Sequence, residues 1–218
     1  MTIKSLVRKL IPNFLLSIYH YKLALLAAIL FWFPSRNLAV IGVTGTSGKS
    51  TTVDFITRIL EKTGYKVASI SSIRFKIGDK EWKNELKMTM PGRFKLQKFL
   101  KQAKKSGCKY VVLEVTSQGI AQYRHKFINF KTAVFTNLSP EHIESHGGFE
   151  NYRKAKLKLF KVAKNTHIVN ADDESSKYFL DIPAVKKISF GLKDAENIKT
   201  GSMGYPGISF SFKGTEFN

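Results

Sequence analysis

The chain has 218 residues, of which 43% are hydrophobic, and it carries 36 lysines and arginines against 16 aspartates and glutamates. This length and composition suit one sizeable folded domain, or one domain with an appendage, and exclude a disordered protein. The formal net charge of +20 favours anionic partners such as nucleotides, phosphorylated substrates or an acidic membrane face. The lysines lack the interleaved aromatic residues of an RNA-binding sheet, so we expect no nucleic-acid partner.

Residues 1–36 differ in kind from the rest of the chain. Three basic residues near the start precede an apolar tract at 14–33, which is interrupted by His20 and Lys22. No small-residue cleavage site follows, which argues against a secretory signal peptide. The tract has the minimum length for a spanning helix, but a charge near its middle is costly in lipid. A helix lying on the inner leaflet of a membrane, or docked on the folded domain, fits this pattern better.

From residue 37 onward, strand patterns alternate with helix patterns. In chain order we expect a strand at 38–43, an amphipathic helix through 53–60, a strand at 66–70, a hairpin around 78–79, a helix through 94–103, strands at 110–115 and 132–136, a basic helix at about 151–163, strands at 167–170 and 187–190, and a pair of strands at 207–212 and 215–217. Such alternation predicts an α/β fold with a doubly wound, mostly parallel sheet, preceded by an apolar helix. Ligands of such sheets bind at the carboxyl ends of the strands.

A glycine turn between the first strand and its helix is the strongest functional signal in the sequence. Gly45 and Gly48 let backbone N–H groups turn toward phosphate oxygens, and Lys49 can reach the terminal phosphates. The hydroxyl of Ser50 can be a ligand of Mg²⁺. The pattern departs from the general P-loop, which would place a glycine at Val43. The predicted nucleotide-binding residues are Gly45, Thr46, Ser47, Gly48, Lys49, Ser50 and Thr51.

Three further polar groups stand at or after the ends of predicted strands. Glu114 ends an apolar strand, where a buried carboxylate needs a cation such as Mg²⁺. His142 lies in a polar loop that follows another strand, and Lys156 lies on the next helix. Taken singly, Glu114 could pair with a lysine, His142 could cap a helix and Lys156 could be a surface lysine. The single cysteine, Cys108, excludes an internal disulfide, fits a reducing and therefore cytoplasmic location, and is expected to pack as a small apolar residue.

Together these segments resemble the central, ATP-binding domain of the Mur ligases. The segments that carry the resemblance are 45–52, 113–119, 135–142, 146–152, 155–156 and 170–173. The resemblance implies an ATP-dependent ligase of peptidoglycan precursor synthesis, acting on a UDP-N-acetylmuramoyl-peptide and an amino acid. In that reaction a substrate carboxylate takes the γ-phosphoryl group, and the resulting acyl phosphate is attacked by the amine.

The resemblance also implies roles for individual residues. Lys49, Glu114, His142 and Lys156 would be catalytic. Ser50 and Glu114 would hold one Mg²⁺, His142 would hold a second, and Lys156 would carry a carbamate. The residues that match substrate-contacting positions are Thr89, Thr116, Gln122 and Arg124. Met90 stands where the family has a second threonine, which puts one substrate hydrogen bond in question.

The resemblance covers one of the family's three domains. We therefore expect an N-terminal helical segment at 1–36 and a central domain at 37–218 that is incomplete at its C-terminal end. A fragment of a longer protein is favoured over a reduced module, because an unfinished sheet edge would expose backbone and apolar surface. A ligase resembling folylpolyglutamate synthetase and a membrane-associated nucleotide-binding module without ligase activity remain as alternatives.

Overall fold

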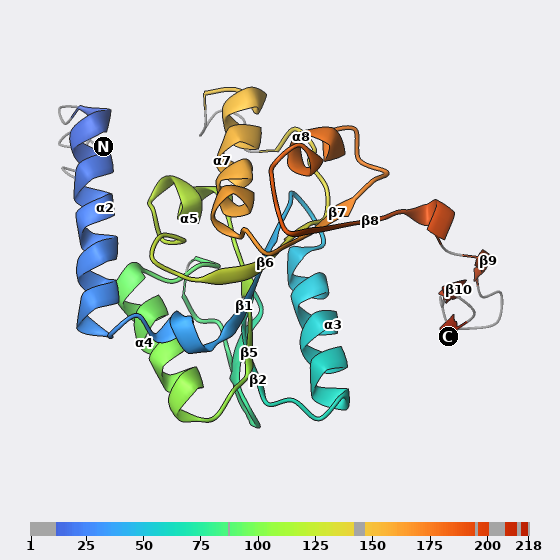
Figure 1. The fold of residues 1–218 in the computed structure, drawn as a ribbon, viewed down its shortest axis with the longest axis horizontal. Helices are drawn as coiled ribbons and strands as arrows, with labels where there is room; N and C mark the ends of the chain where they lie inside the picture. Colours follow the sequence, from blue (N-terminus) through green and yellow to red (C-terminus); the bar gives the residue numbers. More distant parts are fainter. Residues whose placement is uncertain are drawn as a thin grey trace.

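A computed structural model describes residues 12–86, 88–141, 147–194, 196–200, 208–212 and 215–217 (Figure 1). Within these residues the main feature is an eight-stranded sheet with the order β4-β3-β2-β5-β1-β6-β7-β8. The strands of this sheet are β1 Ala39–Thr44, β2 Val67–Ile70, β3 Arg74–Ile77, β4 Lys80–Lys83, β5 Tyr110–Glu114, β6 Phe130–Phe135, β7 Thr166–Asn170 and β8 Lys186–Phe190. The six strands from β2 to β8 along this order pair in parallel, and β3 and β4 add an antiparallel hairpin. The predicted mostly parallel sheet is confirmed.

Helices precede and follow these strands, and three short strands form a second sheet. The helices are α2 Asn13–Leu30, α3 Lys49–Lys62, α4 Arg93–Lys105, α5 Ser117–Ala121, α7 Phe149–Val162 and α8 Ser176–Leu180, with 3-10 turns η1 Pro34–Asn37 and η2 Leu192–Asp194. The second sheet pairs β9 Glu196–Thr200, β10 Ile208–Phe212 and β11 Thr215–Phe217 in the order β11-β10-β9. The antiparallel pairing of β10 with β11 confirms the predicted C-terminal pair of strands.

Side chains of the parallel strands alternate between two buried faces. On β5, Val111 and Leu113 belong to the cluster that packs under α4, α7 and α8, whereas Val112 belongs to the cluster under α3. Figure 1 shows α3 on one side of the sheet and α4 on the other. Because both faces are covered, the strands read as nearly continuous apolar runs. Cys108 is 6% exposed in the larger cluster, as predicted.

Strand β1 is the switch point of the doubly wound sheet. The chain passes from β1 through α3 toward β2, and it later crosses from β5 on one side of β1 to β6 on the other. Open α/β sheets bind their ligands in the crevice beyond the strand ends at such a point. The glycine turn follows β1 directly, so the fold places it in that crevice.

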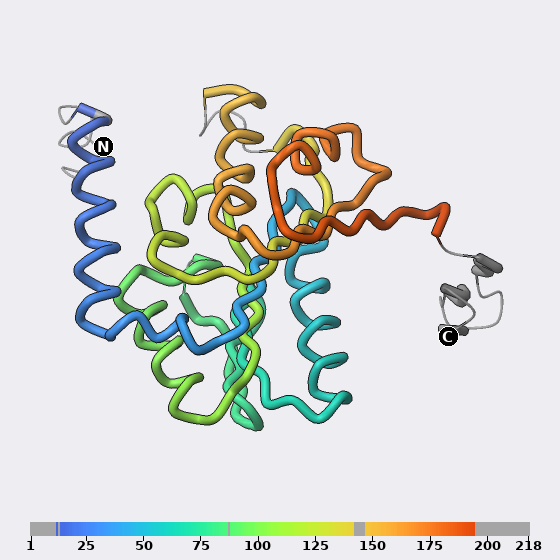
Figure 2. Tube along the Cα trace, viewed as in Figure 1, coloured from blue at the N-terminus to red at the C-terminus, as the bar shows by residue number. Residues whose placement is uncertain are grey.

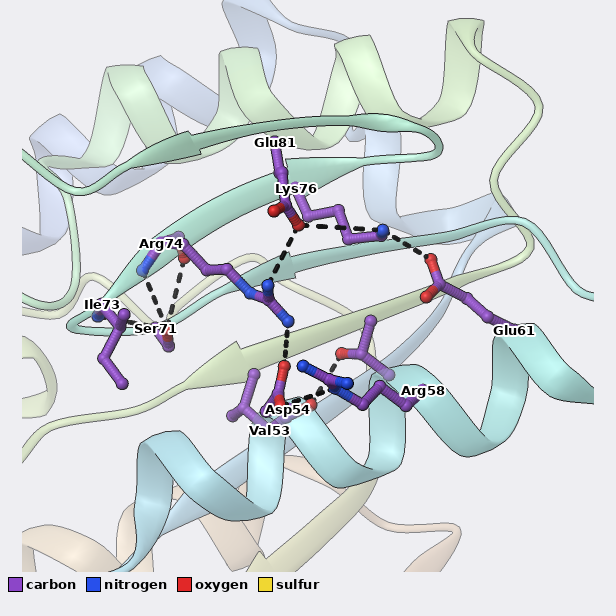
Figure 3. A network of polar contacts seen from close by, with 10 residues as sticks. Val53, Asp54, Arg58, Glu61, Ser71, Ile73, Arg74, Lys76 and Glu81 are labelled. Atoms are coloured by element: carbon purple, nitrogen blue, oxygen red, sulfur yellow. Dashed lines mark hydrogen bonds and ion pairs between the residues drawn. The ribbon is translucent and has the colours of Figure 1, made fainter.

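Ion pairs connect the β3–β4 hairpin to α3 (Figure 3). Arg74 of β3 contacts Asp54 of α3 and, at 3.0 Å, Glu81 of β4, while Lys76 lies 3.2 Å from Glu61 of α3. These groups are partly exposed, so each pair contributes at most about 1 kcal/mol. These pairs connect the two strands at this edge of the sheet to the helix that covers one of its faces.

Helix α2 lies along one edge of the molecule and packs on α4 (Figure 2). Its inner face buries Ala24, Ala27 and Ala28 at 0–2% exposure. The outer face exposes large apolar side chains, among them Phe14, Leu15, Ile18, Leu26, Ile29 and Leu30.

Of the three interpretations of residues 14–33, the docked helix is the one that the structure shows. No helix in the described part of the chain has the length and hydropathy needed to cross a bilayer. Contact with a membrane surface stays a prediction.

The buried side chain of His125 destabilises the folded state. His125 is 1% exposed, and among the described residues neither of its ring nitrogens has a hydrogen-bond partner. Burial, with smaller contributions from the positive charges of Lys126 and Lys158, lowers the pKa of His125 to about 3. The ring is therefore neutral at pH 7, and its two polar nitrogens have lost their hydration without compensation.

Substitution His125→Leu is expected to raise the free energy of unfolding by about 1–2 kcal/mol at pH 7. The unfolded histidine takes up a proton near pH 6.5 and the folded one only near pH 3, so the wild type loses stability as the pH falls between those values. The variant is expected to lose this part of the pH dependence. Urea unfolding at pH 7.5 and pH 5 measures both effects.

His167→Leu is the matched control for this prediction. His167 is also fully buried, but its Nε2 bonds the carbonyls of Ala163 at 2.7 Å and Phe160 at 3.0 Å. Its loss leaves buried acceptors unpaired and is expected to destabilise the fold. A His125→Leu variant that is less stable than the wild type would contradict the prediction.

Candidate functional site

The glycine turn has the conformation that a phosphate-binding loop needs. Gly48 caps α3 with φ of +76°, a left-handed conformation that favours glycine. Gly45 passes so close to β6 that an added Cβ would collide with the hydroxyl of Thr136. The amino end of α3, with its positive partial charge, therefore lies directly at the turn.

The segment after β6 supports the turn from the side. Asn137 accepts a hydrogen bond from the amide of Ser47 at 2.8 Å through its side chain, and one from the amide of Thr46 at 2.9 Å through its carbonyl. The amide of Ser139 donates to the hydroxyl of Thr46 at 3.0 Å. Hydrogen bonds from a segment about 90 residues later in the sequence thus hold the turn in place. This supporting role of Asn137 and Ser139 was not predicted.

Glu114 and Ser50 lie against each other beside the turn. The Ser50 hydroxyl donates to Oε2 of Glu114 at 2.6 Å, and the amide of Ser72 donates to the same oxygen at 2.9 Å. Glu114 is 3% exposed at the end of β5, on the α3 face of the sheet. A hydroxyl and a carboxylate fit Mg²⁺, which prefers oxygen ligands and completes its shell with waters and phosphates. Among the described residues no group of three His, Cys, Asp or Glu side chains could hold a metal, so waters and phosphate oxygens would supply the remaining ligands of this site.

Two lysine ammonium groups reach the carbonyls of the turn. Lys49 Nζ donates to Thr46 O at 2.6 Å, and Lys156 Nζ donates to Gly45 O at 2.6 Å. Lys156 is 1% exposed on α7, so it is not a surface lysine. Burial, with a smaller contribution from the charge of Lys49, lowers the pKa of Lys156 to about 7. Burial also lowers the pKa of Lys49, against the opposing effect of Glu114 and Glu141.

Lys49, Glu114 and Lys156 line one cavity of about 260 Å³ beside the turn, whereas the predicted residues Ser47, Gly48, Ser50 and Thr51 are not on its wall. The predicted residues on its wall are Gly45, Thr46, Lys49, Thr89, Glu114, Thr116 and Lys156. The structure therefore brings together residues that lie up to 111 positions apart in sequence. Larger hollows of about 360 and 520 Å³ lie between the β3–β4 hairpin and α4, away from the turn. Because the buried titratable groups meet at the smaller cavity, it is the candidate site.

Two predicted substrate residues do not line this cavity. Gln122 and Arg124 lie in the loop after α5, where Arg124 donates to the Gln122 side chain at 2.7 Å and to the carbonyl of Met90. Met90 itself is 2% exposed and packs against Gly119. The residue that replaces the family threonine therefore packs its side chain in the core and offers its backbone oxygen to Arg124. His142 lies outside the described residues, as does His146.

Five further residues on the cavity wall had no predicted role: Ser72, Ser117, Gln118, Glu141 and Tyr152. Tyr152 lies one helical turn before Lys156, whose Nζ is 4.3 Å from the ring centroid, and the tyrosine hydroxyl is 3.3 Å from that of Thr46. Ser72 follows β2, and Glu141 precedes the undescribed histidine. The spacing of four between Tyr152 and Lys156 on a predicted helix was the available signal. Ser72 and Glu141 had no comparable signal, because their places depend on how the loops close.

A doubly wound α/β sheet with a glycine turn at its switch strand, a lysine and serine after the turn, and a buried carboxylate beside them defines a P-loop type of nucleotide-binding domain. The chain matches the Mur ligase middle domain over residues 43–217. It therefore belongs to the Mur ligase family.

Similar proteins agree with this assignment. The chain is 35% identical to a UDP-N-acetylmuramoyl-L-alanyl-D-glutamate--2,6-diaminopimelate ligase of Syntrophomonas wolfei, covering 83% of this chain and 37% of the relative. A solved structure of a ligase of the same name matches with a TM-score of 0.70 and 25% identity, over 84% of this chain and 39% of that one. E. coli FolC, solved in complex with DHPP and ADP, matches with a TM-score of 0.65 and 19% identity, over 89% of this chain and 51% of that one. At that identity the FolC match shows the fold alone. The chain spans less than half the length of the curated relative that it matches.

Proposed function

We propose that this chain is the ATP-binding core of a ligase that adds an amino acid to a UDP-N-acetylmuramoyl-peptide, as a UDP-N-acetylmuramoyl-tripeptide synthetase does. The observation that supports it is the meeting of Lys49, Glu114 and Lys156 at one cavity beside the glycine turn. In the proposed reaction the substrate carboxylate attacks the γ-phosphorus of ATP and ADP leaves. The amine of the amino acid then displaces phosphate from the acyl phosphate and loses a proton, which gives the amide.

The residues of the turn would act by charge. Lys49 and the backbone amides of the loop would place positive charge around the phosphoryl group during its transfer. Such electrostatic stabilisation of the transition state supplies most of the rate enhancement in phosphoryl transfer. Ser50 and Glu114 would hold Mg²⁺, which would neutralise charge between the β- and γ-phosphates. A second ion bound through His142 belongs to the same proposal.

Lys156 would carry the carbamate. A neutral amine adds CO₂ and releases one proton, and the lysine side chain then ends in a carboxylate. The pKa of about 7 leaves about half of the Lys156 amines neutral at neutral pH, which an ordinary lysine would not allow. The proposed carbamate would keep one N–H on Nζ, the atom that now donates to Gly45 O, and would add a carboxylate group to the cavity.

The substrate would approach from the side of α5. Thr89 and Thr116 line the cavity wall there, and Thr116 also caps α5 by accepting a hydrogen bond from the amide of Gly119 at 3.1 Å. Arg124 is half-buried, and among the described residues it pairs with no carboxylate. A desolvated guanidinium of this kind favours an anionic partner, in accord with its proposed contact to the substrate.

The proposed division of the chain follows from these roles. Residues 37–218 would form the ATP-binding domain, whereas 1–36 would form a separate helical segment, with the ligase working in the cytoplasm.

Phosphate release from ATP tests the function. The full chain is incubated with ATP and Mg²⁺ and either UDP-N-acetylmuramoyl-dipeptide plus an amino acid or folate plus glutamate, and amide product is measured by mass spectrometry. We expect release only with the muramoyl substrate. Stimulation by folate alone would favour the folylpolyglutamate alternative. Nucleotide binding without any amide product would favour a binding module that has no ligase activity.

A further inference from the structure

The loop that carries Gln122 and Arg124 is held from outside the sheet by α2. Tyr123 and Phe127 of this loop have φ of 58° and 60°, a left-handed conformation that costs a non-glycine residue about 1 kcal/mol or more. The Tyr123 hydroxyl lies 2.7 Å from that of Ser17 on α2. The ring of Tyr21 on α2 meets both loop rings edge-on, with centroids 6.0 Å from Tyr123 and 5.2 Å from Phe127. Contacts from α2 thus stabilise a strained loop.

Arg93 makes a second, polar connection. It is the first residue of α4, and its Nη2 donates to the backbone carbonyl of Gln122 at 2.6 Å and bonds Nδ1 of His20 on α2 at 2.6 Å. A guanidinium has only donors, so Nδ1 of His20 must be the acceptor and the ring proton lies on Nε2. The histidine therefore fixes the direction of Arg93, which in turn fixes the backbone at Gln122.

The connection ends at Arg124. Its Nε and Nη2 donate to Oε1 of Gln122 at 3.2 and 2.7 Å, and its Nη1 donates to Met90 O. Oε1 of Gln122 receives both bonds, so the guanidinium plane follows the position of Gln122. A continuous series of hydrogen bonds thus runs from His20 through Arg93 and Gln122 to Arg124.

We propose that α2 is a positioning element of the substrate site, in which His20 and Arg93 set the loop at Gln122 and so aim Arg124 at an anionic group of the substrate. The inference rests on the proposed function for its substrate, and it adds His20, Arg93 and Tyr123 as positioning residues. It also gives α2 a role independent of any membrane. A merely structural helix would stabilise the fold without affecting the direction of one guanidinium.

Hydrogen exchange in the full chain tests the positioning without any substrate. His20→Leu removes the acceptor for Arg93, whereas His20→Asn keeps an acceptor near the place of Nδ1. The amides of Tyr123 and Arg124 bond to Ile120 O and Gly119 O, so the exchange of residues 119–127 reports on the loop. We expect exchange there to be about tenfold faster in His20→Leu and near wild type in His20→Asn, with residues 45–52 unchanged in both.

Lys98→Met, an exposed position on α4, is the control and is expected to change neither region. Equal exchange at 119–127 in the wild type and His20→Leu would overturn the proposal. Faster exchange spread evenly over 45–52 and 119–127 would also overturn it, because that pattern reports general destabilisation rather than positioning.

Kinetics then test the link to the substrate. We expect His20→Leu to raise KM for the muramoyl substrate about tenfold while KM for ATP and kcat stay within about twofold. Rescue of KM in His20→Asn is expected. If the wild type itself makes no product, the proposed function fails, and the exchange experiment still decides whether α2 positions the loop. If product forms and KM is unchanged in His20→Leu, the positioning role fails alone.

Discussion

Lys49→Ala is expected to lower ATP turnover by about a thousandfold or more. Lys49 Nζ lies over the turn, 2.6 Å from Thr46 O, and is the cation that would face the β- and γ-phosphates. Alanine removes this charge and leaves the nearby carboxylates of Glu114 and Glu141 with one cation fewer. Phosphate release and calorimetric titration with a non-hydrolysable ATP analogue measure turnover and affinity separately.

Lys62→Ala, at the exposed C-terminal end of the same helix, is the control for this change. It removes an equal charge from α3 far from the turn, so turnover is expected to stay within about twofold. Unchanged turnover in Lys49→Ala would count against the whole assignment of the nucleotide site.

Lys156→Met is expected to have two opposite effects. Turnover should fall by at least about a hundredfold, because methionine forms no carbamate and presents no charge to the cavity. Stability should rise by more than about 1 kcal/mol at pH 6.5, because the wild type buries an ammonium group at 1% exposure. Function and stability conflict at this residue, as is common where a side chain is held in a costly environment.

The pH dependence of this stability change has a definite sign. In the unfolded chain a lysine keeps its proton up to about pH 10.5, and folded Lys156 loses it near pH 7. Between these values the unfolded state binds more protons, so wild-type stability rises with pH. The gain from Lys156→Met is therefore expected to be largest below pH 7 and smaller at pH 9.

Urea unfolding at pH 6.5 and pH 9, beside turnover with and without added bicarbonate, measures these effects. Lys154→Met, at an exposed position two residues earlier on α7, is expected to change neither stability nor turnover. A Lys156→Met variant that keeps wild-type turnover would remove the carbamate from the proposal. A stability gain that does not shrink toward pH 9 would contradict the lowered pKa.

Much of the fold was predictable because local patterns determine it. The apolar runs predicted the parallel strands to within about two residues, and Gly78 with Asp79 predicted the β3–β4 hairpin. Helix α5 was not predicted, since five residues are too few for a helical period to show. Thr116 caps the start of this helix with its side chain, and it takes this role only once the chain turns after β5.

The candidate site was likewise predictable only in part. The sequence by itself determined the glycine turn from Gly45 to Thr51, because a strand, two glycines and an amphipathic helix specify a local backbone path. Only the tertiary structure decided that Glu114 meets Ser50, that Lys156 is buried with a pKa near 7, and that α2 docks on the loop before Arg124. The physical reason is that burial, charge proximity and helix docking depend on segments far apart in the chain, and no periodicity within one segment records which partner will cover it.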